Sequence, residues 1–313
     1  MTDTILEVEG LQTHFLQDDG PIRAVDGVTF QVPKGKTVCV VGESGCGKSV
    51  TARSVLGIVD APGKVVAGRI RWRGQSDVDL AALDPGSDEF RRIRGKEIAM
   101  VFQEPMASLS PMYTVANQLV ETIRLHLPMS KDQAYEHGKN LLGRVGIPRP
   151  AQTMESYPFQ LSGGMCQRVM IAIALSCHPS LLIADEPTTA LDVTTQARII
   201  DLLVQIQADT EMSLLFITHD LGVVAEIADE VVVMYLGTVV EQGAVDDIFH
   251  DPQHPYTRAL LESIPRMGRG VRQRLRSIEG QVPHPLNRPP GCPFHPRCRE
   301  AVAGVCDRID PPT

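Results

Sequence analysis

The chain has 313 residues, which is enough for one large domain or two smaller ones. Its 43% hydrophobic and 22% charged residues are typical of a globular protein and exclude disordered, collagen-like and disulfide-stapled classes. The net charge of −8 argues against a protein that coats duplex DNA, so we expect no nucleic-acid partner.

Membrane insertion and export are also disfavoured. No apolar run approaches the roughly 18–20 residues that span a bilayer. The first residues lack the basic and apolar stretches of a secretory signal. We therefore expect a protein that stays in the cytoplasm, where its seven cysteines are not expected to form disulfides.

Short apolar runs and helical patterns alternate along most of the chain. Strands buried on both faces are expected at residues 37–41, 181–184, 214–218 and 231–234. A helix is expected at 196–207, and residues from about 104 to 178 show only helical patterns punctuated by proline. This order predicts an α/β fold with a parallel sheet and a helical subdomain inserted at 104–178.

The composition changes near residue 251. The last 63 residues hold 11 of the 23 prolines, and their basic residues are ten arginines against six acidic residues. Proline interrupts helices, so this part is unsuited to long ones. We therefore predict a main domain at 1–250 and a C-terminal extension at 251–313.

A glycine-rich motif follows the first predicted strand. It matches G-x-x-x-x-G-K-[ST] at every fixed position: Gly42, Glu43, Ser44, Gly45, Cys46, Gly47, Lys48 and Ser49. Such a loop turns its backbone N–H groups inward, and the helix expected after it adds its positive end, so the motif predicts a polyphosphate site. Lys48 is expected to reach the β- and γ-phosphates, and the Ser49 hydroxyl to bind Mg²⁺.

Two carboxylates end the predicted strand at 181–184. Asp185 is expected to hold Mg²⁺ or its water. Glu186 is its neighbour, and because side chains alternate along a strand it points elsewhere and is suited to accept a proton from attacking water. An acidic pair in this position is also common as a helix cap. The phosphate loop predicted in the same chain favours the catalytic interpretation over the capping one.

A second glycine motif runs from residue 161 to 168, with the sequence LSGGMCQR. It resembles the signature sequence of the ATP-binding-cassette (ABC) superfamily. Ser162, Gly163 and Gly164 before a helical run create another anion-binding helix start. The resemblance implies that Ser162, Gly163, Gly164 and Gln167 close over the phosphate loop of a second subunit, so that two nucleotides hold a head-to-tail dimer.

Further elements occur in the order found in this superfamily. Gln103 resembles the glutamine that joins the core to the helical insertion and contacts the metal or the water. Residues 190–192, which end in Asp192, resemble the loop that crosses the dimer interface, and His219 resembles the switch histidine near the γ-phosphate. Phe15 lies where the superfamily has the aromatic residue that stacks on adenine. The resemblance also implies that Thr51, three residues after Lys48, contacts the nucleotide.

Two cysteines lie within the predicted nucleotide-binding motifs. Cys166 stands in the signature where similar proteins usually have a basic residue, which puts one cross-interface or phosphate contact in doubt. Cys46 lies at a variable position of the phosphate loop. We expect its thiol to face solvent and to make the ATPase sensitive to thiol reagents.

The C-terminal extension resembles that of ATPases from dipeptide and oligopeptide importers. The similarity is carried by residues 254–261, 278–283 and 291–298, and the importer subfamily is also used for nickel and some sugars. In similar proteins three cysteines spaced like Cys292, Cys298 and Cys306 join a fourth to hold a four-iron four-sulfur cluster. The sequence ends at Thr313 without that fourth cysteine.

Several interpretations of the extension therefore stay open. An iron–sulfur cluster is one, a zinc site with His295 and the three cysteines is a second, and free thiols are a third. The arginines between residues 266 and 276 suggest a solvated surface, with RNA or an anionic lipid as the alternative.

Taken together, the resemblance implies a RecA-like P-loop NTPase core with a β-rich N-terminal part. It implies the ATP-hydrolysing, Mg²⁺-dependent subunit of a bacterial peptide importer at the cytoplasmic face of the membrane. Expected partners are a second ATPase subunit, either self or paralogue, two permease subunits and an extracytoplasmic binding protein. Alternatives are nickel or sugar as the solute, a non-transport ABC ATPase, and a regulatory module with an inert nucleotide site; the last is disfavoured because Glu186 and His219 are present.

Overall fold

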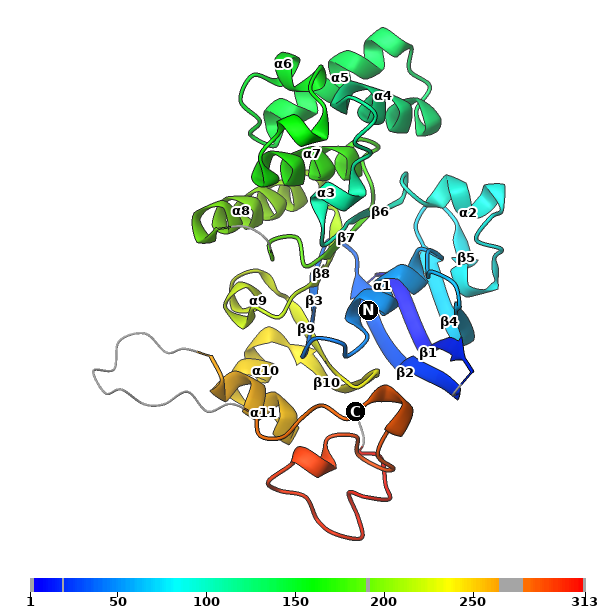
Figure 1. The fold of residues 1–313 in the computed structure, drawn as a ribbon, viewed down its shortest axis with the longest axis vertical. Helices are drawn as coiled ribbons and strands as arrows, with labels where there is room; N and C mark the ends of the chain where they lie inside the picture. Colours follow the sequence, from blue (N-terminus) through cyan, green and yellow to red (C-terminus); the bar gives the residue numbers. More distant parts are fainter. Residues whose placement is uncertain (1–2, 19, 190–191, 265–277, 312–313) are drawn as a thin grey trace, which may run out of the picture.

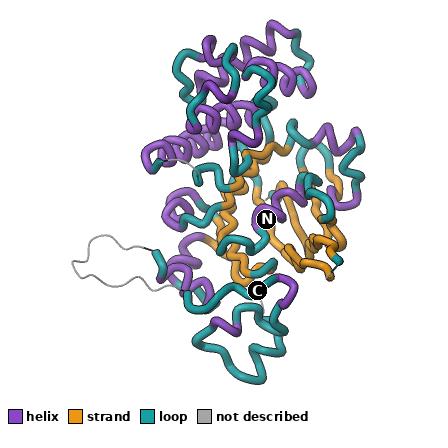
Figure 2. The backbone as a smooth tube through the Cα atoms, viewed as in Figure 1, coloured by secondary structure: helices purple, strands orange, loops and turns teal. Residues whose placement is uncertain are grey.

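The computed structural model describes the whole chain except residues 1–2, 19, 190–191, 265–277 and 312–313. Two sheets form its centre (Figure 1). The helices between residues 105 and 175, here called the helical group, lie at one end, and the described part of the extension at 251–313, here called the C-terminal segment, lies at the other. Figure 2 shows that this last segment consists mostly of loops. In the part of the chain that is described, no helix has the length and apolar character needed to cross a bilayer.

The larger sheet has six strands in the order β10-β9-β3-β8-β7-β6. Strands β6, β7, β8, β3 and β9 are parallel, and β10 pairs antiparallel with β9. Its strands are β3 (Thr37–Val41), β6 (Ile98–Val101), β7 (Leu181–Asp185), β8 (Ser213–Ile217), β9 (Glu230–Tyr235) and β10 (Thr238–Ala244). The predicted runs are therefore strands, with ends within one residue of those expected.

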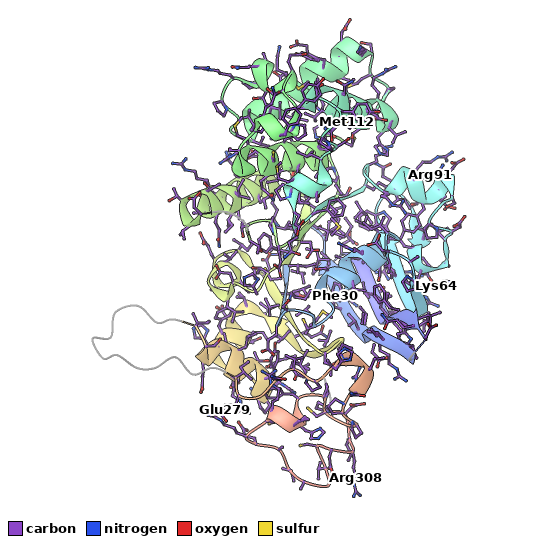
Figure 3. The ribbon with its side chains drawn as sticks, viewed as in Figure 1. Phe30, Lys64, Arg91, Met112, Glu279 and Arg308 are labelled. Atoms are coloured by element: carbon purple, nitrogen blue, oxygen red, sulfur yellow. The ribbon has the colours of Figure 1, made fainter. Side chains whose placement is uncertain are left out.

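Both faces of this sheet are covered, as the apolar runs predict. Cys39 and Val41 of β3 belong to one core cluster together with residues of the helical group, whereas Val38 and Val40 belong to a second cluster that the N-terminal sheet shares. Figure 3 shows Phe30 inside this second region, where it is 2% exposed. Because alternate residues of one strand enter different cores, the strand has no polar face.

The smaller sheet is antiparallel, in the order β2-β1-β4-β5. Its strands are β1 (Thr4–Gln17), β2 (Gly20–Pro33), β4 (Gly63–Arg73) and β5 (Asp77–Asp79). This is the β-rich N-terminal part that the resemblance implies.

Helices lie between the strands of the larger sheet and after the last of them. Five lie between β6 and β7: α3 (Pro105–Ser108), α4 (Val115–His126), α5 (Lys131–Arg144), α6 (Pro150–Met154) and α7 (Gly163–Leu175). The others are α1 (Lys48–Val55), α2 (Asp88–Ile93), α8 (Val193–Thr210), α9 (Leu221–Ile227), α10 (Val245–His250) and α11 (Pro255–Glu262). Helix α7 begins directly at Gly163, because the Ser162 side chain caps it.

The C-terminal segment packs on the sheet. Tyr256, Cys292 and Phe294 are buried in the same core cluster as the larger sheet. The rings of Tyr235 in β9, Tyr256 and Phe294 contact one another, with centroids 4.8–5.4 Å apart. The change of composition at residue 251 therefore does not coincide with an edge of the core.

Candidate functional site

The carboxyl ends of four parallel strands bring the predicted catalytic groups to one edge of the larger sheet. The phosphate loop follows β3, Gln103 follows β6, Asp185 ends β7, and His219 follows β8. In open α/β sheets this edge is where ligands bind. Segments that are far apart in the sequence thus meet at one place.

The phosphate loop requires glycine at two positions. Gly42 has φ 152°, and a Cβ there would lie 2.2 Å from the Met234 carbonyl oxygen. Gly47, which precedes helix α1, has φ 100°, and its Cβ would lie 2.3 Å from the Ala24 carbonyl oxygen. Any side chain at either position would force β9 or β2 to move, so the curled loop depends on both glycines.

Lys48 is held inside the loop. Its side chain is 4% exposed, and its ammonium donates hydrogen bonds to the carbonyl oxygens of Gly42 (2.8 Å) and Glu43 (3.1 Å). The Thr51 hydroxyl is likewise used inside the loop, where it donates to the Gly47 carbonyl oxygen at 3.0 Å. The ammonium is therefore held at the start of the loop mainly by two backbone oxygens.

Cys46 does not face solvent, so that expectation is wrong. Its side chain is 2% exposed, and its sulfur lies 3.8 Å from the Lys48 ammonium. Burial raises the pKa of the Cys46 thiol, because it disfavours the thiolate. The loop turns inward here and packs this small side chain against the core.

We expect Cys46 to react slowly with alkylating reagents. Iodoacetamide at neutral pH should modify it at least about tenfold more slowly in the folded chain than in denatured chain, because the reactive species is the thiolate. Mass spectrometry of the peptide that contains Cys46 measures both rates. Equal rates would contradict the buried position.

Ser49 and Asp185 form a pair beside the loop. The Ser49 hydroxyl donates to Asp185 Oδ1 at 2.8 Å, and Asp185 is 2% exposed. Burial raises the pKa of the Asp185 carboxyl and the nearby charge of Glu186 adds to this, whereas the bond from Ser49 opposes it. A hydroxyl and a carboxylate oxygen in contact are donors of the kind that Mg²⁺ prefers.

Glu186 is the centre of a polar cluster. Its Oε2 accepts hydrogen bonds from the Gln103 amide (3.0 Å) and the Thr189 hydroxyl (3.0 Å), and His219 Nδ1 lies 3.5 Å away. The Glu186 side chain is 12% exposed, whereas that of His219 is 59% exposed. Glu186 has φ 45°, a left-handed conformation that turns the chain at the end of β7. The three predicted catalytic residues, Gln103, Glu186 and His219, thus lie together.

The signature residues lie at the start of helix α7. Ser162 caps this helix, since its hydroxyl accepts from the Met165 N–H at 3.3 Å. Gln167 is 1% exposed, and its amide nitrogen is buried without a hydrogen-bond partner. Cys166 is buried, and its thiol donates to the Pro158 carbonyl oxygen, so its side chain packs inside the helical group.

The structure does not bring the signature to the phosphate loop of the same chain. Figure 1 shows α7 in the helical group and α1 beside the smaller sheet, with the sheet edge between them. Asp192 caps helix α8 and accepts from the N–H and the hydroxyl of Thr195 at 3.0 and 2.8 Å, which lowers the pKa of its carboxyl. Ala190 and Leu191 lie outside the described residues.

Phe15 is half-buried in β1, where it pairs with Ile22 of β2 and Gly63 of β4. The same strand contacts the helix after the phosphate loop, because the hydroxyls of Thr13 and Ser54 lie 2.8 Å apart. Phe15 is therefore two residues along β1 from Thr13, which contacts helix α1 through Ser54.

For the cysteines of the C-terminal segment, the sequence leaves open an iron–sulfur cluster, a zinc site and free thiols. Within the described ranges, no three His, Cys, Asp or Glu side chains are arranged to hold a metal ion. Cys292 is 9% exposed, and its sulfur lies 3.8 Å from His254 Nε2, while His295 Nδ1 lies 2.9 Å from the Cys292 carbonyl oxygen. The observed arrangement thus supports neither the iron–sulfur cluster nor the zinc site. The arginines at 266–276 lie outside the described residues.

Sequence reasoning gave no role to two residues that contact the phosphate loop. The Tyr256 hydroxyl accepts from the Glu43 N–H at 2.9 Å, and Arg297 donates to the Glu43 carboxylate at 2.6 and 3.1 Å. Both lie in stretches that carried the resemblance of the C-terminal extension. Their only sequence signal was that resemblance, because nothing local links residue 297 to residue 43.

Comparisons with known proteins show the family of the chain. The family model described as ABC transporter matches residues 25–189, and the model for the oligopeptide/dipeptide transporter C-terminal region matches residues 240–306. Among similar proteins, the oligopeptide transport ATP-binding protein AppD of Bacillus subtilis (strain 168) is 51% identical over 300 residues, 96% of this chain and 90% of that protein. The dipeptide transport ATP-binding protein DppD of Escherichia coli (strain K12) is 49% identical over 298 residues, 95% of this chain and 89% of that protein.

Solved structures show the same fold. The dimeric post-hydrolysis structure of the ATP-binding cassette MJ0796 with ADP and Pi has a TM-score of 0.68 and 25% identity, covering 77% of this chain and 99% of that chain. CbiO1 of Clostridium perfringens, part of the transporter complex cbiONQ, has a TM-score of 0.65 and 29% identity, covering 80% and 92%. The phosphate loop, the acidic pair and the match of more than half of the sequence lead to one conclusion: the chain belongs to the ABC transporter family and is an ATPase that carries the oligopeptide/dipeptide transporter C-terminal region.

Proposed function

We propose that this chain is the ATP-hydrolysing subunit of a bacterial importer for dipeptides or oligopeptides, bound to the cytoplasmic face of the membrane through permease subunits. The observation that carries the ATPase part is the meeting of the phosphate loop, Asp185, Glu186, Gln103 and His219 at one sheet edge. The peptide class is supported by relatives near 50% identity that are named for peptide transport, and by the matching C-terminal region.

The phosphates of ATP are proposed to bind the loop from Gly42 to Ser49. Backbone N–H groups at a curled loop and a helix start favour anions, and Ser44 and Gly45 are exposed at its rim. Lys48 would exchange its bonds to the two backbone oxygens for the β- and γ-phosphates. Phe15 on β1 is proposed to stack on adenine.

The residues present fit a Mg²⁺ ion. Ser49 and Asp185 supply oxygen donors 2.8 Å apart, and Gln103 lies at the same edge. These three residues would hold the ion, with phosphate oxygens and water completing its shell. When bound, Mg²⁺ neutralises charge on the β- and γ-phosphates and orients them.

Glu186 is proposed to be the general base. It is bonded to Gln103 and Thr189 and faces His219, so its carboxylate is held in one position. There it would orient water and accept its proton as the water attacks the γ-phosphorus. Gln103 and His219 would position the water and the γ-phosphate, so that most of the acceleration comes from placement and charge compensation.

The second half of each nucleotide site is proposed to come from another subunit. Ser162 caps helix α7, which contains Gly163, Gly164 and Gln167, and Asp192 caps helix α8. Both helices lie apart from helix α1, which follows the phosphate loop of the same chain (Figure 1). A helix start capped by Ser162 is suited to a γ-phosphate presented from outside. A head-to-tail dimer, with itself or a paralogue, would bring the two halves together. The similar MJ0796 cassette was solved as a dimer bound to ADP and Pi, which supports pairing of two cassettes.

A cleft between the sheet edge and the helical group is the proposed permease contact. Its volume is about 490 Å³, and its lining includes Phe102, Leu109, Tyr113 and Met170. Met112, labelled in Figure 3, is 78% exposed beside it.

We also propose that the chain is divided by function into residues 1–250 and 251–313, with the helical subdomain at about 104–178 inside the first part. A substrate-binding protein is proposed as the further partner.

The proposal is tested by reconstituting the chain in vesicles with its permease pair and binding protein. We expect ATP hydrolysis to be stimulated by a peptide-loaded binding protein and not by nickel or a sugar. Stimulation by nickel or sugar alone would overturn the peptide class. Hydrolysis per molecule should also fall on dilution of the isolated chain, because each site needs two subunits; a rate independent of dilution would overturn the composite site.

A further inference from the structure

The C-terminal segment contacts the phosphate loop at Glu43. The Arg297 guanidinium donates two hydrogen bonds to the Glu43 carboxylate, at 2.6 Å to Oε2 and 3.1 Å to Oε1. The Tyr256 hydroxyl accepts from the Glu43 N–H at 2.9 Å. One residue of the loop is thus held through both its backbone and its side chain by residues more than 200 positions away.

Arg297 itself is fixed by its surroundings. Its side chain is 5% exposed and lies near the rings of Tyr235 and Phe294, at 5.8 and 6.0 Å from their centroids. It also donates to the Tyr235 hydroxyl at 3.3 Å and to the Glu279 carbonyl oxygen at 3.1 Å. A guanidinium held by four acceptors and two rings has little freedom to leave Glu43.

The pairing matters because of the charge on Glu43. This residue follows Gly42 in the loop, and its carbonyl oxygen also accepts from the Lys48 ammonium at 3.1 Å. An unpaired carboxylate next to a triphosphate site would repel the anion, and in a half-buried place this repulsion is only partly screened. Arg297 pairs with this carboxylate, whose side chain is 27% exposed, and so neutralises its charge.

We propose that Arg297 is a positioning residue for the phosphate loop, through which the C-terminal segment sets the affinity of the ATPase for MgATP. The inference rests on the nucleotide site proposed above. It gives the extension a role in ATP binding that depends on an ion pair and not on any metal. Arg297 acts through Glu43 and does not itself contact the nucleotide.

The test is Arg297→Met in the full chain, with binding of a fluorescent ATP analogue plus Mg²⁺ and steady-state hydrolysis as readouts. We expect Kd and KM to rise about tenfold, as for loss of a charge-assisted hydrogen bond, with a smaller change in kcat. Arg299→Met is the matched control, because Arg299 pairs instead with the exposed side chain of Glu279. That control should keep the wild-type Kd and KM.

The double variant Glu43→Gln with Arg297→Met separates charge from folding. Removing the carboxylate removes the repulsion, so we expect the Kd of the double variant to return to within about threefold of wild type. This return in Kd is expected whether or not the double variant melts at a lower temperature than wild type. A single variant within about twofold of the wild-type Kd, or a double variant that binds as weakly as the single one, would overturn the inference.

A further variant covers a failure of Arg297→Met to fold. Arg297→Lys keeps the charge but loses the paired geometry, so its Kd should be at least about threefold above that of wild type; a wild-type Kd would count against the inference. Wild-type chain that fails to bind the analogue would instead contradict the proposed nucleotide site. The two failures are therefore distinguishable.

Discussion

Glu186→Gln should reduce ATP hydrolysis by about 100- to 10,000-fold while leaving ATP binding intact. Glutamine has nearly the same shape and can still contact Gln103 and Thr189, but it cannot take a proton from water. Since bound ATP is then not consumed, an ATP-bound dimer should accumulate. Turnover is measured by phosphate release, and the dimer by size-exclusion chromatography with ATP.

Glu104→Gln is the control for Glu186→Gln. Glu104 is an exposed carboxylate beside Gln103, and its side chain does not cap helix α3. We expect the isolated Glu104→Gln chain to hydrolyse ATP at the wild-type rate. Near-wild-type hydrolysis by the Glu186 variant would refute its assignment as the base.

Asp185→Asn should strongly reduce ATP hydrolysis and yet not destabilise the nucleotide-free chain. Without the carboxylate, Mg²⁺ loses its proposed protein anion, so we expect turnover to fall at least about 100-fold. The pKa of Asp185 is raised by burial, which means that the fold disfavours its charged form. Asparagine removes that buried charge, so the variant should melt at the same or a higher temperature at pH 7 to 8.

The pH dependence of this stability difference follows from the direction of the pKa shift. The buried charge lowers the stability of the wild-type fold only where Asp185 is ionised, at pH values above its raised pKa. As pH falls through that raised pKa towards the ordinary value of about 4, the carboxyl becomes neutral and the advantage of Asp185→Asn disappears. Thermal melts across this range test the point; a variant that melts well below wild type at pH 7 would contradict it.

Residues close together in the sequence made much of the site predictable. The loop from Gly42 to Ser49 lies between a buried strand and a helix, and its glycines are required by their own φ angles and by close backbone contacts. The acidic pair ends a strand, and Ser162 starts a helix, as short-range patterns indicate. These features depend on backbone geometry within a few residues, which local sequence controls.

Burial and long-range contacts were not predictable in this way. The sequence does not show that Cys46 turns inward, because that depends on how β9 and the loop pack. The cysteines of the extension resemble a metal motif by spacing, but spacing along the chain does not set the distances among their sulfur atoms.

By itself, the sequence determined the family, the positions of the main parallel strands and the glycine loop that follows the first of them, because these follow from motifs and apolar runs with local causes. The order of the strands in the sheet came from the structure. Only the tertiary structure decided that Glu186 gathers Gln103, Thr189 and His219, and that Arg297 pairs with Glu43. The physical reason is that such contacts arise when whole elements pack against each other. Glu43 and Arg297 are 254 positions apart in the sequence, so no local pattern predicts their contact.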